Sequence, residues 1–354
     1  MSATIIAVDI NPATRSVVTG TERYTLEIAG RLPRAAPELT WKFFASRPKR
    51  ELGVDVTVLP FRRLWSQVRL PVALAGVRPD LLFVPGHAIP FAWTGRAVAV
   101  VHDLAFERFP AAYAGPQRLY LQATTRWAVS RAKLLIAVSE STRNDLVSLY
   151  GANPDRIRVV PHGGGETPHV RQASASRLGE LGLAGDFVLQ VGRIEARKNQ
   201  LAALAAVERV PGLTLAVAGP EVDSGLAAKL RASRSCRVLG RVDDATLELL
   251  YKRAKAVVVP SLYEGFGLPV LEAMSRGQVV VAARTSSLPE VGGDAVLYVD
   301  DPGDPAAFAE VLRQAIAGGD ARADLTRRAV KRAREFTWDR CAQATANVVR
   351  EALR

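Results

Sequence analysis

Short apolar runs rich in β-branched residues recur along the whole chain, and stretches with helical spacing of apolar residues separate them. Runs of this kind, bounded by turn-forming residues, are typical of buried strands. Their alternation with helices predicts parallel sheets joined by crossover helices. The strands predicted in the first half are Thr4–Ile10, Thr40–Ala45, Asp55–Leu59, Leu81–Val84, Ala97–Val101, Leu134–Val138 and Ile157–Val160. Those predicted in the second half are Phe187–Val191, Thr214–Ala218, Arg237–Leu239, Ala256–Val259, Gln278–Ala282 and Val296–Val299.

A glycine-rich break divides this α/β pattern. Gly163-Gly164-Gly165 follows a predicted strand, and Pro168 closes the break. A chain of 354 residues favours two domains of ordinary size. The break therefore predicts a hinge between two Rossmann-like domains, residues 1–165 and 166–339. Ligands of such sheets bind outside the carboxyl ends of the strands.

Two carboxylates eight positions apart, Glu264 and Glu272, flank the segment Gly265-Phe266-Gly267-Leu268-Pro269 after a predicted strand. Glycines let a ligand approach the backbone closely, and the free amides at a helix start face an anion. Two carboxylates that accept hydrogen bonds beside an anion site suit a sugar nucleotide. The amides would bind its diphosphate, and the carboxylates would bind its hydroxyls. The alternative is an ordinary helix start with an acid near its N-terminus and a surface glutamate. Spacing alone leaves both interpretations open.

The segment from Glu264 to Glu272 resembles the E-x7-E motif of retaining glycosyltransferases with the GT-B fold, family four, and the match is nearest the mannosyltransferase-like branch. Further matching segments occur in the family's order: Val101-His102-Asp103-Leu104, Ala137-Val138-Ser139-Glu140-Ser141, Val159-Val160-Pro161-His162-Gly163, Val191-Gly192-Arg193 with Lys198-Asn199, and Leu288-Pro289-Glu290-Val291-Gly292. The resemblance covers nearly the whole chain. It implies two Rossmann-like parallel-sheet lobes facing a central cleft. It also implies a C-terminal helix, residues 340–354, that crosses back to the acceptor-side lobe 1–165, while 166–339 binds the nucleotide sugar.

Arg193 and Lys198 lie five positions apart at a predicted strand-to-helix turn. Two cations at this spacing suit a diphosphate that gains charge as it leaves. A merely solvated basic helix start is unfavourable against the helix dipole. The resemblance assigns the donor diphosphate to this pair. It further implies donor contacts from Val242 to the base, Glu272 to the ribose, Glu264 to sugar hydroxyls, and the main-chain amides of Phe266, Gly267 and Leu268 to sugar and diphosphate.

Two regions of the first half complete the expected site. Gly20 and Thr21 lie in a loop that resembles the family's glycine-rich phosphate loop, although a plain strand-to-helix loop fits as well. His102 ends a predicted strand beside Asp103, and the resemblance implies a position next to the transferred sugar and the attacking hydroxyl. A lone histidine would more often be a hydrogen-bonded structural residue. His87, in a second strand-end loop, is an acceptor-side candidate together with His102 and Asp103.

The expected catalytic residues are therefore His102, Glu264, Arg193 and Lys198. No carboxylate clearly supplies a nucleophile, and the resemblance implies front-face attack, in which the leaving phosphate helps to take the acceptor's proton. No metal and no cofactor besides the nucleotide sugar are expected. Asp300-Asp301-Pro302-Gly303-Asp304 superficially resembles a D-x-D metal motif, but its proline and glycine favour a helix-entry loop.

The net charge of +12 is concentrated in the first half: residues 1–170 hold 21 Lys and Arg against 13 Asp and Glu (+8), and residues 171–354 hold 26 against 22 (+4). A basic half suits an anionic membrane, nucleic acid or a phosphorylated substrate. The chain has 39 arginines but only 8 lysines, and a GC-rich genome would also favour this composition.

Phe61–Pro71 mixes arginines with aromatic residues, which predicts either a membrane-contacting helix or an amphipathic core helix. No apolar run approaches the roughly 20 residues that span a bilayer, and the first residues suggest a strand rather than an export signal. The expected location is the cytoplasm, with peripheral contact at the inner membrane face as an alternative.

The sequence thus predicts a retaining, metal-independent hexosyltransferase of polysaccharide biosynthesis, moving mannose from GDP-mannose to a glycan or lipid-linked glycan. A UDP-sugar donor such as UDP-glucose is the first alternative. A nucleotide-sugar epimerase disagrees with the E-x7-E pattern. The alternative from a different functional class is a non-catalytic protein that binds a sugar nucleotide or a polyanion. Nucleic-acid binding is not expected, because no such module is visible and 6% aromatic residues offer few stacking platforms.

Overall fold

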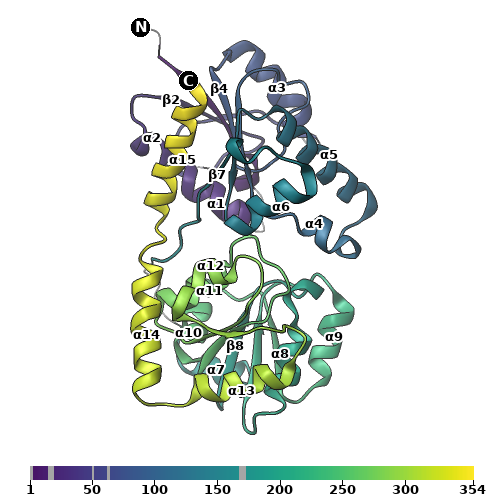
Figure 1. Cartoon of the computed structure of the whole chain (residues 1–354), viewed down its shortest axis with the longest axis vertical. Coiled ribbons are helices and arrows are strands. Elements are labelled where there is room, and N and C mark those ends of the chain that lie inside the picture. Colours follow the sequence, from purple (N-terminus) through teal and green to yellow (C-terminus); the bar gives the residue numbers. More distant parts are fainter. Residues whose placement is uncertain (1–2, 15–19, 50–51, 62–63, 167–172) are drawn as a thin grey trace. The chain divides into compact units, whose positions relative to one another are not determined.

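The computed structural model describes residues 3–14, 20–49, 52–61, 64–166 and 173–354 (Figure 1). The chain divides into two compact units, Met1–Gly163 with Thr337–Arg354 and Gly164–Phe336. The divisions fall at 163/164 and 336/337, rather than at the expected 165/166 and 339/340. No helix within the described residues combines the length and the apolar character needed to cross a membrane.

The first unit is built on a parallel sheet of seven strands in the order β3-β2-β1-β4-β5-β6-β7. Its strands are β1 (Ile5–Asp9), β2 (Thr40–Ala45), β3 (Val56–Val58), β4 (Leu81–Val84), β5 (Ala97–Val101), β6 (Leu134–Ala137) and β7 (Ile157–Val159). The strand order reverses between β1 and β4. Crevices at the carboxyl ends of such a reversal are the usual ligand sites of doubly wound sheets.

The helices of the first unit include a segment from the far end of the chain. Its α-helices are α1 (Gly20–Ala29), α2 (Leu32–Ala35), α3 (Trp65–Val77), α4 (Ala105–Arg108), α5 (Gly115–Arg131), α6 (Glu140–Tyr150) and α15 (Trp338–Leu353), and its 3₁₀ turns are η1 (Asn11–Thr14), η3 (Pro110–Ala112) and η4 (Pro154–Arg156). Helix α15, yellow in Figure 1, packs against α1, α2 and β4 to β6. Thr337 caps it by accepting a hydrogen bond from the amide of Arg340 at 3.2 Å. The expected return of the C-terminal helix to the first lobe is confirmed.

The second unit has a parallel sheet of six strands in the order β10-β9-β8-β11-β12-β13. Its strands are β8 (Phe187–Val191), β9 (Thr214–Ala218), β10 (Cys236–Gly240), β11 (Ala256–Val259), β12 (Val280–Ala283) and β13 (Leu297–Val299). Its helices are α7 (Ser176–Glu180), η5 (Ala196–Lys198), α8 (Gln200–Val207), α9 (Ser224–Ala232), α10 (Asp244–Arg253), α11 (Leu268–Ser275), α12 (Leu288–Gly292), η6 (Gly293–Ala295), α13 (Pro305–Ile316) and α14 (Asp320–Ala333). Here the order reverses between β8 and β11, the two strands that carry the predicted donor motifs.

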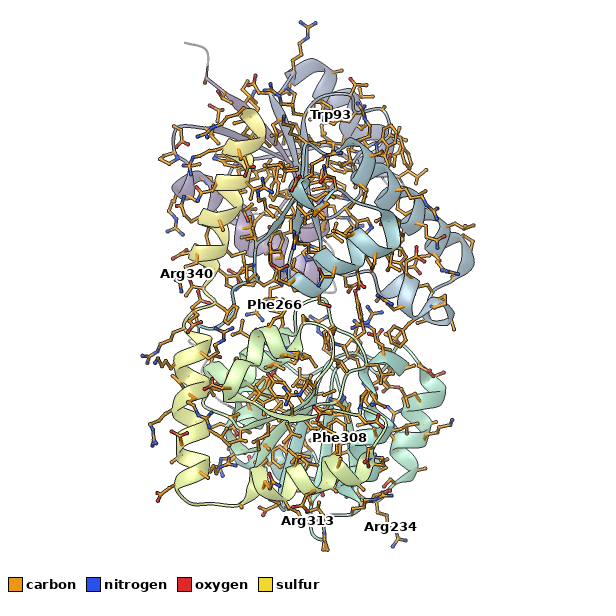
Figure 2. The ribbon with its side chains drawn as sticks, viewed as in Figure 1. Trp93, Arg234, Phe266, Phe308, Arg313 and Arg340 are labelled. Carbon is orange, nitrogen blue, oxygen red and sulfur yellow. The ribbon has the colours of Figure 1, made fainter. Side chains whose placement is uncertain are left out.

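The two sheets confirm the predicted α/β class. Every residue of β4, β5, β6, β11 and β12 is buried, as expected for parallel strands covered on both faces. Figure 2 shows Phe308 of α13 inside the second unit, whereas Arg234 and Arg313 point outward at its edge. The largest error in a strand start concerns Gln278, which we expected to begin β12. Gln278 instead donates its amide to the carbonyl of Ala273 and closes the turn after α11.

Gly163 and Gly165 allow close backbone packing where the chain passes between the units. A Cβ on Gly163 would lie 2.3 Å from the amide nitrogen of Trp338, within the first unit. A Cβ on Gly165 would lie 1.8 Å from the carbonyl oxygen of Ala333, within the second. Gly165 also donates its amide to Phe336 at 2.8 Å. These glycines are needed for space. Pro168, at the end of the predicted hinge, lies outside the described residues.

Candidate functional site

The loop after β8 carries the predicted cations and packs closely against the loop after β9. Gly192 follows β8 with φ 143°, and a Cβ on Gly219 would lie 1.9 Å from the carbonyl oxygen of Gly192. Gly219 donates its amide to Gly240 at 2.8 Å, which joins the end of β10 to the same edge. The carboxyl ends of three adjacent strands are therefore held together at this edge.

Glu264 is the centre of a buried ion-pair cluster at this edge. One carboxylate oxygen lies 2.5 Å from Nζ of Lys198, and the other lies 3.3 Å from Nη1 of Arg197. Ser261 donates its hydroxyl to Glu264 at 2.8 Å. Glu264 is only 6% exposed and Lys198 only 8%. The structure thus joins two predicted site residues that are 66 positions apart in the sequence.

The charges in this cluster determine its protonation. Burial favours the neutral form of Glu264, but the cations of Lys198 and Arg197 and the hydrogen bonds from Lys198 and Ser261 outweigh burial and lower its pKa to about 2. Burial also lowers the pKa of Lys198, while the Glu264 carboxylate raises it. Glu264 is therefore ionised at neutral pH, and its carboxylate favours the charged form of Lys198 against the effect of burial.

Arg193 differs from Lys198 in its exposure. Its side chain is 43% exposed, and its nearest acid is Glu195, whose carboxylate lies 3.6 Å from Nη2. The same Glu195 makes a closer pair with Arg197, at 2.8 Å. Arg193 is therefore the accessible cation of the predicted pair, and Lys198 is the buried one. Arg197, which was not among the predicted site residues, bridges Glu195 and Glu264.

The predicted helix start after Glu264 is confirmed. Gly267, at φ 103°, precedes α11, and Pro269 lies in its first turn. Leu268 is the first helical residue, so its amide belongs to the free N-terminal amides of α11. Phe266, labelled in Figure 2, is buried with its ring edge against Phe336 at 5.8 Å between centroids. One turn into the helix, the Glu272 carboxylate accepts a hydrogen bond from the hydroxyl of Tyr251 at 3.0 Å.

Three serines form hydrogen bonds with Glu264, one with its carboxylate and two with its backbone. Besides Ser261, the hydroxyl of Ser286 accepts the amide of Glu264 at 2.8 Å, and Ser287 donates its hydroxyl to the Glu264 carbonyl at 2.9 Å. Ser286 has a positive φ of 45°, which is uncommon for a residue other than glycine. Sequence reasoning missed these hydrogen bonds, because serines in a loop carry no pattern that identifies their partners.

In the first unit, the structure brings His102 together with His162. Nε2 of His102 lies 2.7 Å from the carbonyl oxygen of Pro85, and Nδ1 lies 3.2 Å from Nε2 of His162. A carbonyl only accepts, so Nε2 of His102 carries the proton and Nδ1 accepts from His162. The ring of Tyr24 on α1 lies against both imidazoles, with 5.0 Å between centroids in each case. His162 and Tyr24 were not among the predicted site residues.

Burial keeps these histidines neutral. It lowers the pKa of His102, against the opposing charges of Asp103 and Glu22. Burial, with a smaller contribution from His102, lowers the pKa of His162 well below its usual value and that of His87 to about 4. At neutral pH the cluster therefore consists of uncharged imidazoles that act through hydrogen bonds.

The remaining predicted residues lie in both units. Gly20 begins α1, and Thr21 follows it in the first turn, while residues 15–19 of the predicted phosphate loop lie outside the described residues. Asp103 accepts the amide of Ala105 at 3.0 Å, and His87 stacks on Phe106 at 6.2 Å between centroids. Val242 is half-buried in the turn between β10 and α10.

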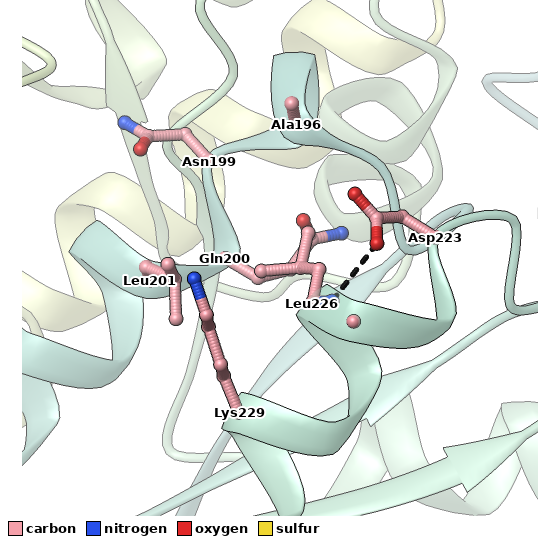
Figure 3. Close-up of a pocket in the computed structure, with 8 residues that line it drawn as sticks. Ala196, Asn199, Gln200, Leu201, Asp223, Leu226 and Lys229 are labelled. Carbon is pink, nitrogen blue, oxygen red and sulfur yellow. Dashed lines mark hydrogen bonds between the residues drawn. The ribbon is translucent and has the colours of Figure 1, made fainter.

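A pocket of about 340 Å³ lies between the first turns of α8 and α9 (Figure 3). Its lining residues are Ala196, Asn199, Gln200, Leu201, Asp223, Gly225, Leu226 and Lys229. Asp223 caps α9 by accepting the amide of Leu226 at 2.9 Å, the dashed line of Figure 3. The lining includes neither Glu264 nor the predicted cation pair, so this pocket is beside the candidate site and is not the site itself.

Helix α3 has two apolar faces. Trp65, Leu70 and Leu74 are buried in the core of the first unit. Leu64, Val68 and Val72 recur every four residues on the other face and are exposed. The helix therefore has the core role that the sequence analysis left open, and it also carries an exposed apolar stripe. Arg62 and Arg63 lie outside the described residues.

The acidic stretch near residue 300 is the predicted helix-entry loop. Asp304 caps α13 by accepting the amides of Ala306 and Ala307, at 2.8 and 3.0 Å. Asp301 accepts the amide of Gly303 at 2.7 Å, and Asp300 pairs with Arg284 at 2.6 Å. Within the described ranges, no three His, Cys, Asp or Glu side chains form a group that could hold a metal ion.

Two family profiles match the two halves of the chain. The profile "Glycosyltransferase Family 4" matches residues 18–163, and "Glycosyl transferases group 1" matches residues 181–332. An O-antigen chain mannosyltransferase B of Escherichia coli is 33% identical over 267 residues, which is 71% of this chain and 69% of that protein. A D-inositol 3-phosphate glycosyltransferase of Acidothermus cellulolyticus is 36% identical over 64% of this chain, but the match spans only 54% of the relative.

Solved structures have the same fold at low sequence identity. Sucrose-phosphate synthase from Thermosynechococcus elongatus aligns with a TM-score of 0.75 and 20% identity over 98% of both chains. HepE of Anabaena, solved in complex with UDP-glucose, aligns with a TM-score of 0.77 and 18% identity over 98% of this chain and 99% of that one. The fold predicted from the sequence is thereby confirmed.

Proposed function

Because this chain belongs to family 4 of the glycosyltransferases with the GT-B fold, we propose that it moves mannose from GDP-mannose to a glycan or a lipid-linked glycan. The observation that carries the donor sugar is the 33% identity to a mannosyltransferase over two thirds of both chains. HepE binds UDP-glucose, and this favours UDP-glucose as the second candidate. The name of the mannosyltransferase relative supports a saccharide acceptor.

The charges of the second unit support a donor site at the carboxyl ends of β8 and β11. Arg193, which is exposed, would meet the diphosphate first, and Lys198 would add charge from its buried position. The first amides of α11, from Phe266 to Leu268, would bind sugar and phosphate oxygens. In this proposal Glu272 binds the ribose and Glu264 the hydroxyls of the transferred sugar, while Val242 contacts the base. The proposal gives Gly20 and Thr21 a phosphate contact.

We propose a retaining reaction by front-face attack. The bond between the anomeric carbon and the leaving phosphate breaks, the acceptor oxygen bonds to the same face, and its proton passes to the leaving phosphate oxygen. Glu264 is a poor nucleophile, because two cations and Ser261 hold its carboxylate and lower its pKa to about 2. His102 is a poor general base, because its Nδ1 and Nε2 both have hydrogen-bond partners. A glycosyl-enzyme trapped from the native protein would contradict this mechanism.

Metal-independent transfer is part of the proposal, since Arg193 and Lys198 can supply the positive charge that the leaving diphosphate needs. The expected result is full activity in EDTA; abolition of turnover by the chelator would contradict it.

His87, His102 and Asp103 are proposed to border the acceptor. The exposed Leu64, Val68 and Val72 support a peripheral contact of a cytoplasmic enzyme with an anionic membrane that carries a lipid-linked acceptor.

A thermal-shift screen of GDP, UDP, ADP and TDP with their common sugar conjugates tests the donor site. A ligand at 100 times its Kd stabilises the fold by about 2.7 kcal/mol. GDP and GDP-mannose should shift the transition most, and Arg193→Ala should abolish the shift. Lys198→Ala should abolish it too, with a cost in stability because buried Glu264 loses its closest cation. Asp300→Ala is a matched control on an exposed ion pair. Absence of a shift with every nucleotide would refute the donor site.

A further inference from the structure

A buried glutamine interrupts the apolar strand β8. Gln190 lies between Leu189 and Val191 and is only 3% exposed. Its side-chain NH₂ donates to the main-chain carbonyl of Lys198 at 2.8 Å. The strand thereby fixes the backbone of the buried cation in the candidate donor site, eight residues further along the chain.

A second buried glutamine holds the other cation in the same way. Gln200, drawn at the start of α8 in Figure 3, is 1% exposed, and its NH₂ donates to the main-chain carbonyl of Arg193 at 2.8 Å. Asn199 follows Lys198 and directly precedes α8. Its side-chain amide donates to the carbonyls of Pro260 and Pro302, at 3.1 and 2.7 Å. The loop from Arg193 to Lys198 is thus held by carboxamides at both of its ends.

Both glutamines donate a hydrogen bond through their side-chain NH₂, but their side-chain carbonyl oxygens accept none among the described residues. Both of these oxygens, Oε1 of Gln190 and Oε1 of Gln200, are buried. An unsatisfied buried oxygen is unfavourable for stability, and an apolar side chain of similar length would avoid it. Local choices that stability alone does not favour are typical of functional sites.

We propose that Gln190 and Gln200 are positioning residues that fix the main chain of Lys198 and Arg193, so that the two cations meet the donor diphosphate together. This inference rests on the proposed function of the loop. Charges act best when they are held in place before the ligand arrives. A misplacement of about 1 Å can cost on the order of 100-fold in activity, and methionine in place of either glutamine would release one carbonyl.

The test uses Gln190→Met and Gln200→Met in the full chain, with calorimetric titration of GDP and of GMP. The matched control is Gln278→Met, because Gln278 is also buried with an unused Oε1 but precedes β12 at the opposite end of the sheet. Each test variant should bind GDP about 10-fold more weakly, or about 1.4 kcal/mol. Binding of GMP, which lacks the second phosphate, should change less than about 2-fold, and the control should match the wild type.

The outcomes separate the two proposals. A wild-type protein that binds no nucleoside diphosphate refutes the proposed function itself. A wild type that binds GDP while both variants keep its affinity, or lose GDP and GMP equally, refutes only the positioning role. Should a methionine variant fail to fold, Gln190→Asn and Gln200→Asn shorten the side chain by one methylene and remove the same hydrogen bond while keeping an amide.

Discussion

Glu264 is one carboxylate between two cations, the buried Lys198 and the mostly buried Arg197, and this single residue joins the ends of β8 and β11. Removing one partner of a buried ion pair leaves an uncompensated charge, which costs far more than breaking a pair on the surface. The histidines of the first unit differ from Glu264, because in them the uncharged form, which burial favours, prevails. Burial keeps His87 and His102 uncharged, so their contribution to stability depends on pH.

Glu264→Gln should lower the free energy of unfolding by about 3–5 kcal/mol, because Lys198 would stay buried without its closest anion. Urea denaturation at pH 7 measures this change. Glu310→Gln is the control, since the Glu310 pair with Arg313 is exposed and should contribute less than about 1 kcal/mol. Similar losses of unfolding free energy in both variants would show that the buried cluster contributes no more to stability than an exposed ion pair.

Acidification from pH 6.5 towards 4 should destabilise the protein through His87. The unfolded chain binds a proton near pH 6.5, whereas burial lowers the pKa of folded His87 to about 4, so protons favour the unfolded state over this interval. The full interval corresponds to about 3 kcal/mol. Urea denaturation at pH 7, 6 and 5 should record a falling free energy of unfolding, and His87→Gln should flatten the curve. An unchanged slope in that variant would exclude His87 as the source.

At the scale of elements, the carboxyl ends of β8, β9 and β10 are packed backbone to backbone. Gly219 lies against Gly192, and its amide is bonded to Gly240. This contact fixes where the cation loop leaves the sheet. Glycine is required by the lack of space for a Cβ, and no side-chain interaction of Gly219 is involved.

Gly219→Ala should therefore destabilise the second unit by about 3 kcal/mol or more. The new Cβ would clash with the main-chain carbonyl of Gly192, and the φ of residue 219 is unfavourable for alanine. Gly212→Ala is a matched control, because Gly212 also has a positive φ, of 79°, but its Cβ would have no neighbour within 4 Å. The control should cost about 1 kcal/mol. Chemical denaturation compares the two, and equal losses would contradict close packing as the cause.

At the scale of the whole molecule, two doubly wound units each place candidate residues at strand ends. Lys198 and Glu264 belong to the second unit, and His102 and His162 belong to the first. The hydrogen bonds between Lys198 and Glu264 and between His102 and His162 each join residues of the same unit. A ligand that binds one cluster should therefore stabilise the local structure of that unit.

Hydrogen exchange with saturating GDP should slow at residues 192–199 and 261–268, because ligand binding suppresses local opening of the loops that contact it. The core strands β4 and β5 of the first unit should exchange as before. Arg193→Ala at the same GDP concentration provides the control. Protection confined to the first unit would contradict the location of the donor site.

The sequence by itself determined the α/β class and the segments that form the strands of both sheets, because parallel strands buried on two faces need continuous apolar runs. It also determined that Glu264, Gly267 and Pro269 open a helix after β11, since turn and helix-start preferences are local. Only the tertiary structure decided which polar groups meet. Glu264 pairs with Lys198, His102 with His162, and Gln190 with the carbonyl of Lys198. Residues far apart in the sequence form the first two pairs, and packing of whole strands and loops sets all three, so no local spacing encodes them.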